Sequence, residues 1–174
     1  LIPFLTSSLL INCMIEDLTM PQVFGNYLAF IFGGLNGYGD NYIIPSTLVS
    51  VTITDSNVPE YAFSQCSNIQ TVTIGNAAVV YDNAFSYCSS LTQVNLPETL
   101  TSIGENAFYN CSSLMSINVS ENNQHFVSVN GVLFTRDMKT LICYPVKKGG
   151  SSFSIPNSVT TIGGGAFSSC SSLT

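Results

Sequence analysis

A solenoid of short stacked coils, with a parallel β-sheet along one side, is the fold that this sequence predicts. The phrase Ala-Phe-x-x-Cys-Ser occurs four times, and Cys88 follows Cys66 by 22 residues while Cys111 follows Cys88 by 23. After each of the first three phrases comes an aliphatic pattern that suits a strand with one buried face. A phrase repeated in register marks one packing unit copied several times, because a single coil cannot bury its apolar side alone.

Four six-residue segments have aliphatic residues at their first, fourth and sixth positions. They are Leu48–Ile53, Ile69–Ile74, Leu91–Leu96 and Leu114–Val119. Such a pattern, when it recurs about every 20–29 residues, is typical of leucine-rich repeats. The fourth and sixth residues alternate with polar neighbours, which predicts a parallel sheet on the concave face with an aliphatic ladder behind it.

The segments between strands predict how each coil returns to the next. Pro97 ends a strand because it has no backbone N–H to donate. Ile103 and its equivalent Ile162 then point into the core, Gly104 permits a turn, and a short helical or 3₁₀ piece carries Ala-Phe. Four phenylalanines are expected to stack behind the sheet: Phe63, Phe85, Phe108 and Phe167.

The domain organisation predicted is a repeat region over residues 45–174 with a hairpin insert at about 121–154. In the insert, Phe126–Val129 and Val132–Thr135 flank Asn130-Gly131, the strongest short hairpin signal. All four basic residues lie there, so the insert is predicted to be the one electrostatically distinct surface: Arg136, Lys139, Lys147 and Lys148. Residues 1–44 show no clean repeat and are interpreted as an N-terminal cap or a degenerate repeat region.

Composition excludes several classes of protein. Hydrophobic residues make up 45% and charged residues 8%, which excludes disorder caused by high charge. The net charge is −6 and residues 1–135 contain no Lys or Arg, so neither nucleic acid nor an anionic membrane surface is an expected partner. The apolar opening, residues 1–14, is too short for a membrane span. The chain starts without Met and stops inside a repeat phrase, which suggests part of a longer protein with no direct membrane insertion in this stretch.

The repeat cysteines allow three interpretations. Metal ligands would require local pairs such as Cys-x-x-Cys, which the sequence lacks. Disulfides would join coils about 4.8 Å apart, within the Cα range of a bridge, but parallel side chains do not readily give the required dihedral angle. A row of buried thiols that act as small hydrophobes is favoured. Cys13 and Cys143 are predicted to lie outside this row.

Residues able to catalyse a reaction are scarce. His125 is the only histidine, and it lies in a polar turn context without a nucleophile motif, so we expect a surface histidine and no enzyme. Neither a cofactor nor a metal is expected. The acidic residues near turns are interpreted as solvated, with a calcium site among them as the alternative: Asp55, Glu60, Asp82, Glu98, Glu105 and Glu121.

The run Cys-Ser-Ser-Leu-Thr, followed by Pro and by Thr-x-Ile-Gly-x-x-Ala-Phe, resembles the repeat of BspA-type leucine-rich repeat surface proteins of bacteria and of Trichomonas. The resemblance covers about residues 44–174 and is most specific at Leu91–Cys111 and Ile155–Thr174. It implies secretion, display at the cell surface, and adhesion or ligand binding rather than catalysis.

The outward positions of the predicted strands carry uncharged hydrogen-bonding side chains, which we call the polar strip. Its members are Ser50, Thr52, Thr71, Thr73, Gln93, Asn95, Ser116 and Asn118. Concave solenoid faces are extended binding surfaces, although solubility alone would also favour Ser and Thr. We therefore expect a surface-displayed binding module for adhesion to host or extracellular proteins or glycans. The alternative is a structural spacer of a larger secreted protein, with no ligand of its own.

Overall fold

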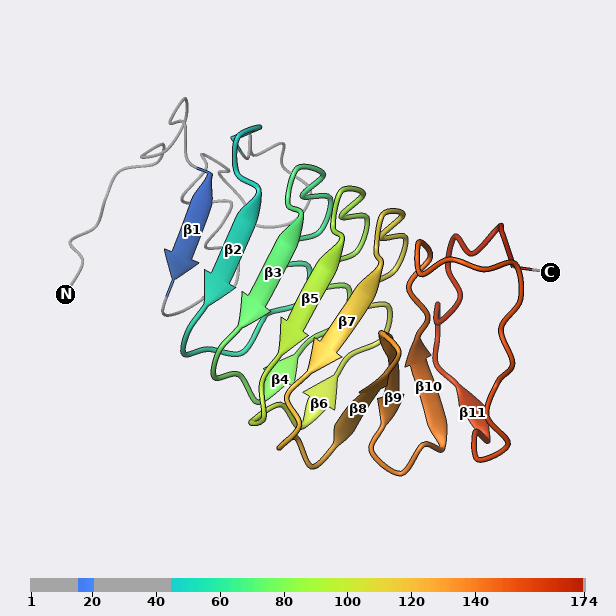
Figure 1. The fold of residues 1–174 in the computed structure, drawn as a ribbon. Coiled ribbons are helices and arrows are strands. Elements are labelled where there is room, and N and C mark those ends of the chain that lie inside the picture. Colours follow the sequence, from blue (N-terminus) through green and yellow to red (C-terminus); the bar gives the residue numbers. More distant parts are fainter. Residues whose placement is uncertain (1–15, 21–44, 174) are drawn as a thin grey trace.

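The computed structural model describes residues 16–20 and 45–173, which form a solenoid of stacked coils (Figure 1). Its strands are β1 (Asp17–Met20), β2 (Ser50–Ile53), β3 (Thr71–Ile74), β4 (Val79–Val80), β5 (Gln93–Leu96), β6 (Ser102–Ile103), β7 (Ser116–Val119), β8 (Phe126–Val129), β9 (Val132–Thr135), β10 (Thr140–Cys143) and β11 (Thr161–Ile162). The described segments contain no helix, and hence none that could span a membrane. This architecture confirms the predicted leucine-rich repeat solenoid.

The main sheet consists of five parallel strands in the order β1-β2-β3-β5-β7 (Figure 1). Equivalent residues of successive coils pair directly, as in the row Val51, Val72, Val94 and Ile117. These inward residues are buried, while their polar neighbours along each strand remain accessible. The period-2 alternation seen in the sequence therefore sets which face of the sheet packs on the core.

The corner of each coil is made of turns and not of the short helical or 3₁₀ piece expected there. Two positions, four residues apart, have a left-handed backbone in each of four coils: Tyr61 and Gln65, Asn83 and Tyr87, Asn106 and Asn110, and Gly165 and Ser169. A left-handed residue interrupts a helical run, because a 3₁₀-helix needs negative φ at every residue. Ser64 N–H donates to Tyr61 O at 3.1 Å, and Cys66 N–H donates to Phe63 O at 3.2 Å, as in successive turns.

The predicted aromatic ladder is present but has a different member at its C-terminal end. Ring centroids lie 5.1 Å apart for Phe63 and Phe85 and 5.8 Å apart for Phe85 and Phe108. Phe167 stacks on Tyr144 at 5.6 Å. Tyr144 N–H also donates to Ala166 O at 2.8 Å, as Phe85 N–H does to Ala107 O. The coil that contains the insert thus supplies Tyr144 at the phenylalanine position, which the sequence pattern did not indicate.

The insert is woven into the solenoid wall. Strands β8 and β9 form the antiparallel hairpin predicted around Asn130-Gly131, and β9, β10 and β11 continue the same sheet. The hairpin also lies against the edge of the main sheet, since Ile117 N–H donates to Gly131 O at 3.0 Å and Ser128 Oγ donates to Ile117 O at 2.5 Å. This contact covers backbone groups that an edge strand would otherwise expose.

A fully buried asparagine joins the hairpin to the coil before it. Asn123 Nδ2 donates to Pro97 O at 2.8 Å and to Leu100 O at 2.9 Å. Its Oδ1 accepts from His125 N–H at 2.8 Å and from Phe126 N–H at 2.7 Å. One side chain therefore satisfies four backbone groups and sets where β8 begins.

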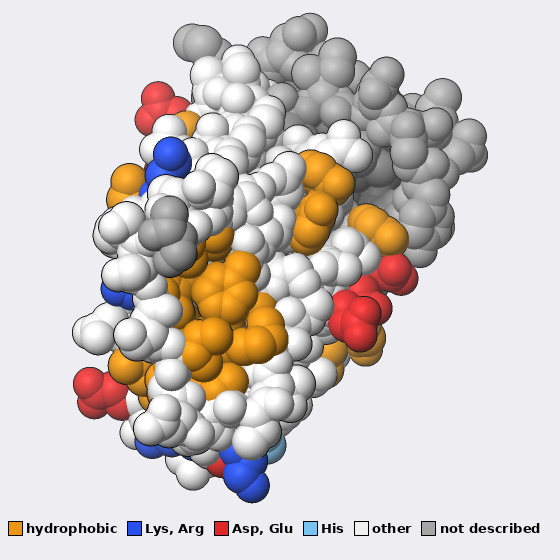
Figure 2. All heavy atoms as spheres, turned by 90° about the vertical axis from the view of Figure 1, so that its right-hand side faces the viewer, with side chains coloured by type: hydrophobic (Ala, Val, Ile, Leu, Met, Phe, Trp, Pro, Cys, Tyr) orange, Lys and Arg blue, Asp and Glu red, His pale blue; other side chains and the backbone are white. Residues whose placement is uncertain are grey.

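The C-terminal end of the solenoid is apolar. Figure 2 shows hydrophobic side chains gathered on this face, and Ile162, expected to point into the core, is 45% exposed. Phe167 and Leu173 are only half-buried, because no described coil lies beyond them. The predicted N-terminal cap or degenerate repeat, residues 1–44, lies outside the described residues except for residues 16–20.

Close approach between coils requires glycine at one corner. A Cβ added at Gly104 would lie 2.4 Å from Asp82 N and 2.7 Å from Tyr81 C, whereas one added at Gly164 would meet nothing within 4 Å. We expect Gly104→Ala to lower the free energy of unfolding by about 1–3 kcal/mol, because the backbone of the previous coil must move. Urea denaturation measures this loss. Gly164→Ala is the matched control and should change the stability by less than about 0.5 kcal/mol.

The Asn123 network gives a second test of stability. Asn123→Ala should cost about 3 kcal/mol or more, because it leaves buried backbone donors and acceptors without partners. Asn122→Ala removes an exposed side chain whose amide donates to Glu98 at 3.1 Å, and should cost less than about 0.5 kcal/mol. Thermal and urea denaturation of the two variants side by side would show the difference. Equal stabilities would contradict the role assigned to Asn123.

Candidate functional site

The polar strip forms two straight rows on the outer face of the main sheet. Register places Ser50, Thr71, Gln93 and Ser116 in one row, and Thr52, Thr73, Asn95 and Asn118 in the other. Each row crosses four neighbouring strands, so the sequence-predicted residues are brought together on one surface. The strip carries no charged side chain.

Hydrogen bonds between side chains link the centre of the polar strip. Asn95 Nδ2 donates to Thr73 Oγ1 at 3.2 Å, and Asn95 Oδ1 accepts from Asn118 Nδ2 at 2.9 Å and from Gln93 Nε2 at 3.0 Å. Asn95 is therefore the hub of a network that spans β3, β5 and β7. Because each amide is held by a neighbour, the network fixes the orientation of these side chains.

Strand β1 extends both rows with residues that sequence reasoning missed. Asp17 pairs with Ser50 and Thr19 pairs with Thr52, and both side chains are exposed. The signal was present in the segment from Ile15 to Met20, which has aliphatic residues at its first, fourth and sixth positions. Asp17 adds a negative charge to this end of the surface.

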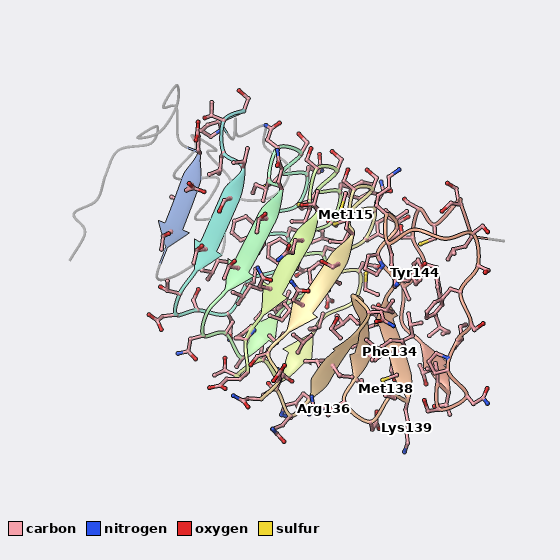
Figure 3. All side chains as sticks on the ribbon, viewed as in Figure 1. Met115, Phe134, Arg136, Met138, Lys139 and Tyr144 are labelled. Carbon is pink, nitrogen blue, oxygen red and sulfur yellow. The ribbon has the colours of Figure 1, made fainter. Side chains whose placement is uncertain are left out.

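The basic residues do not form one patch. Figure 3 shows Arg136 and Lys139 at the turn between β9 and β10, far from Tyr144 at the other end of β10. Lys147 N–H donates to Leu114 O at 2.7 Å, so Lys147 and the adjacent Lys148 lie near the start of β7. The prediction that the insert forms one electrostatically distinct surface is therefore wrong, because β10 separates the two pairs.

Three of the four repeat cysteines form a row of buried thiols, as predicted, whereas Cys170 in the last described coil is only half-buried. Cys66, Cys88 and Cys111 are at most 5% exposed and have free thiols. Cys88 Sγ donates to Phe63 O at 3.0 Å, and Cys111 Sγ donates to Phe85 O at 3.1 Å. The thiols of Cys88 and Cys111 thus each contact the coil before their own. A hydrogen bond with Cys66 and burial raise the pKa of Cys88, while burial and the nearby Cys88 raise that of Cys111.

Cys143 does not occupy the repeat cysteine position, but its buried thiol lies beside the thiols of this row. Burial, followed by the neighbouring thiols of Cys111 and Cys170, raises the pKa of Cys143. It occupies the position that Ala107 has in the preceding coil, since Tyr144 replaces the phenylalanine that follows. The thiol of Cys143 lies near those of Cys111 and Cys170. Cys13 lies outside the described residues.

The groups weighed for catalysis or metal binding are dispersed. His125 is exposed at the start of β8, and the six acidic residues near turns are all exposed. Asp82 has a structural role, because its Oδ1 accepts from Glu105 N–H at 2.8 Å. Among the described residues, no three acidic, histidine or cysteine side chains are placed to hold one metal ion.

The comparison with known families agrees with this geometry. The model of the BspA type leucine rich repeat region matches residues 39–130 and 147–174, in six copies. The chain belongs to this family. The match omits residues 131–146, which include the whole of β9 and β10. Among curated proteins, no significant relative was found.

Two solved structures resemble this family member closely. The pneumococcal vaccine antigen PcpA has a TM-score of 0.70 and 28% identity, over 72% of this chain and 32% of that one. A leucine rich cell surface protein from Faecalibacterium prausnitzii A2-165 has a TM-score of 0.66 and 32% identity, over 74% of this chain and 35% of that one. This chain therefore spans about a third of the length of each protein.

The raised thiol pKa values predict a loss of stability in alkaline solution. The thiols stay protonated in the folded state, so their stabilisation is fully present below the ordinary thiol pKa of about 8.5 and declines as the pH rises above it. Each thiol should contribute a slope of up to about 1.4 kcal/mol per pH unit in that range. Urea denaturation at pH 7.5 and 9.5, with a reductant present, measures the total.

Cys111→Ala is the control for this prediction. It should reduce the stability at both pH values, because it opens a small cavity, but it should also lessen the decline between them. An unchanged decline would show that groups other than the thiols cause it. Rapid reaction of native Cys88 or Cys111 with a thiol reagent would contradict their burial.

Proposed function

We propose that this chain is a surface-displayed binding module, and that the polar strip is its contact surface for an extracellular protein or glycan. Support comes from the two continuous rows of uncharged donors and acceptors across the main sheet. Binding would depend on many hydrogen bonds of modest strength, spread over the surface, rather than on a single pocket. A longer array would multiply such contacts through avidity.

The network around Asn95 is the observation that carries the proposal. Side chains selected only for solubility do not need to be held in place, whereas here three amides are bound to one another and to Thr73. Orienting the side chains in advance lowers the conformational entropy lost on binding. The remaining lone pairs and N–H groups face outward, where a ligand can pair with them.

The comparisons support display at the cell surface. One similar structure is a vaccine antigen of pneumococcus and the other is called a cell surface protein. Both share the repeat fold with this chain, and a surface location for this chain follows by analogy. On the same grounds we infer a role in adhesion and not in catalysis.

The proposal predicts that charge and bulk placed on the polar strip abolish binding. A variant with Thr71→Arg, Thr73→Arg and Asn95→Arg should lose at least tenfold in affinity, because it breaks the network and blocks both rows. Binding of the purified protein to extracellular-matrix proteins and to a glycan panel, measured by biolayer interferometry, provides the assay. The affinity of the variant is then measured for the ligand that the wild-type protein binds.

A matched control places the same charges away from the main sheet. Asn76→Arg, Gln124→Arg and Asn157→Arg change exposed, uncharged positions outside the strip, add the same three positive charges and should leave binding intact. Circular dichroism and thermal denaturation confirm that both variants fold. If the strip variant binds as well as the wild-type protein, the strip is not the contact surface. If the folded wild-type protein binds nothing, the structural spacer becomes the better description.

A further inference from the structure

A cleft separates two coils on the side of the solenoid opposite the polar strip's sheet, and we call it the inter-coil cleft. Residues 103–109 line one wall and residues 163–165 line the other, with Thr140, Ile142 and Cys143 of the intervening coil between them. Its volume is about 200 Å³. None of these residues belongs to the polar strip, so the cleft is a separate site.

The cleft exists because the intervening coil is two residues short. Phe85 follows Val80 by five residues, and Phe108 follows Ile103 by five, but Tyr144 follows Leu141 by only three. The equivalence rests on hydrogen bonds, since Gly163 N–H donates to Leu141 O at 2.8 Å just as Gly104 N–H donates to Val80 O at 2.8 Å. In a coil of the usual length, two more residues would lie between Gly104 of one neighbouring coil and Gly163 of the other. Their absence leaves the space open.

Two backbone N–H groups are left without partners as a result. In the coil before, Asn83 N–H donates to Glu105 O at 3.0 Å and Phe85 N–H donates to Ala107 O at 2.8 Å. The equivalent groups of Asn106 and Phe108 donate to no acceptor among the described residues. Phe108 is only 7% exposed. Both residues line the cleft, so their two N–H groups are available to an oxygen acceptor of a ligand there.

The side chains around the cleft suit an uncharged ligand with hydroxyl groups. No Lys or Arg lines it, and its one charged residue, Glu105, disfavours anions. Asn106 and Tyr109 reach toward Gly165, where an added Cβ would lie 2.6 Å from Asn106 Oδ1 and 3.0 Å from the Tyr109 ring. Small sites of this kind combine an apolar surface with a few well-placed polar groups.

An aromatic surface leads out of the cleft. The rings of Tyr109 and Tyr87 meet edge to face with centroids 5.5 Å apart, and Tyr87 is 49% exposed. Tyrosine offers an apolar face together with a polar hydroxyl, which suits a ligand that is apolar on one side and polar at its rim. The C–H face and ring hydroxyls of a pyranose have this character.

The cleft is closed beyond Tyr109. Asn110 N–H donates to Ser168 Oγ at 3.2 Å, and the Asn110 side chain hydrogen-bonds to the hydroxyl of Ser169. An extended peptide that paired along a strand edge would have to continue past this closed end. The terminal sugar residue of a glycan can fit in a cleft closed at one end, because the rest of the glycan leaves through the other end.

We propose that the inter-coil cleft binds the terminal hexose or N-acetylhexosamine residue of a neutral glycan. Hydroxyl oxygens of the sugar accept from the Asn106 and Phe108 N–H groups, and its hydroxyl groups donate to Asn106 Oδ1 and to the Glu105 carboxylate. The next sugar residue packs on Tyr87 as the chain leaves the cleft.

The test uses a panel of neutral oligosaccharides that end in glucose, galactose, mannose or N-acetylglucosamine. Saturation-transfer NMR identifies those that bind the wild-type chain, and titration gives the affinity. Gly164→Phe should abolish binding, because Gly164 lines the cleft and a Cβ added there would meet nothing within 4 Å, which leaves room for a large side chain to occupy the cleft. Gly164→Ala adds only a methyl group and should bind like the wild-type protein. Tyr87→Ala should weaken binding about two- to tenfold, through loss of the aromatic contact.

The polar strip variant separates this proposal from the proposed function. If the Thr71→Arg, Thr73→Arg, Asn95→Arg protein still binds the same oligosaccharides, the cleft acts independently, as we infer. Oligosaccharide binding that the strip variant loses and Gly164→Phe retains would overturn the cleft proposal and support the strip. Failure of the folded wild-type chain to bind any oligosaccharide on the panel would also overturn it. A peptide that binds the wild-type chain but not the Gly164→Phe variant would overturn it as well.

Discussion

Each coil of this protein is hydrogen-bonded to the next, and this pairing is the constraint on which the rest of the structure depends. Phe63 N–H reaches Ala84 O at 2.7 Å, and Phe85 N–H reaches Ala107 O at 2.8 Å. Such pairing requires nearly equal numbers of residues per coil, because a coil of another length shifts every later donor away from its acceptor. The left-handed corners, the stacked rings and the row of thiols all repeat because the backbone repeats.

The coil that contains the insert departs from this constraint, and the unusual features of the molecule gather there. Its hairpin adds residues on one side while the segment from Leu141 to Tyr144 is short on another. Asn123 compensates for the first change by satisfying four backbone groups. The second change leaves the inter-coil cleft. Both the cleft and the displaced thiol of Cys143 are consequences of fitting an irregular coil into a regular stack.

The two candidate surfaces differ in physical character. The polar strip is open and extended, and its amides are fixed by one another, which favours many weak contacts with a large partner. The inter-coil cleft is small and partly enclosed, with unpaired backbone donors and an aromatic rim. Neither surface carries a basic group among its lining side chains. Uncharged partners are therefore the common expectation, and the two surfaces can be separated by substitutions that do not overlap.

Sequence alone determined the repeat period, the strands of the polar strip, the stacked phenylalanines and the burial of three of the four repeat cysteines, because these depend on patterns within one coil. The left-handed corners were missed, since a turn and a 3₁₀ piece have similar local sequences. The place of Tyr144 in the aromatic ladder, the position of the Cys143 thiol beside the cysteine row, the addition of β1 to the sheet and the inter-coil cleft were decided only by the tertiary structure. Each of these depends on how coils distant in the sequence align in space, and that alignment is set by hydrogen bonds between coils rather than by the residues of any single one.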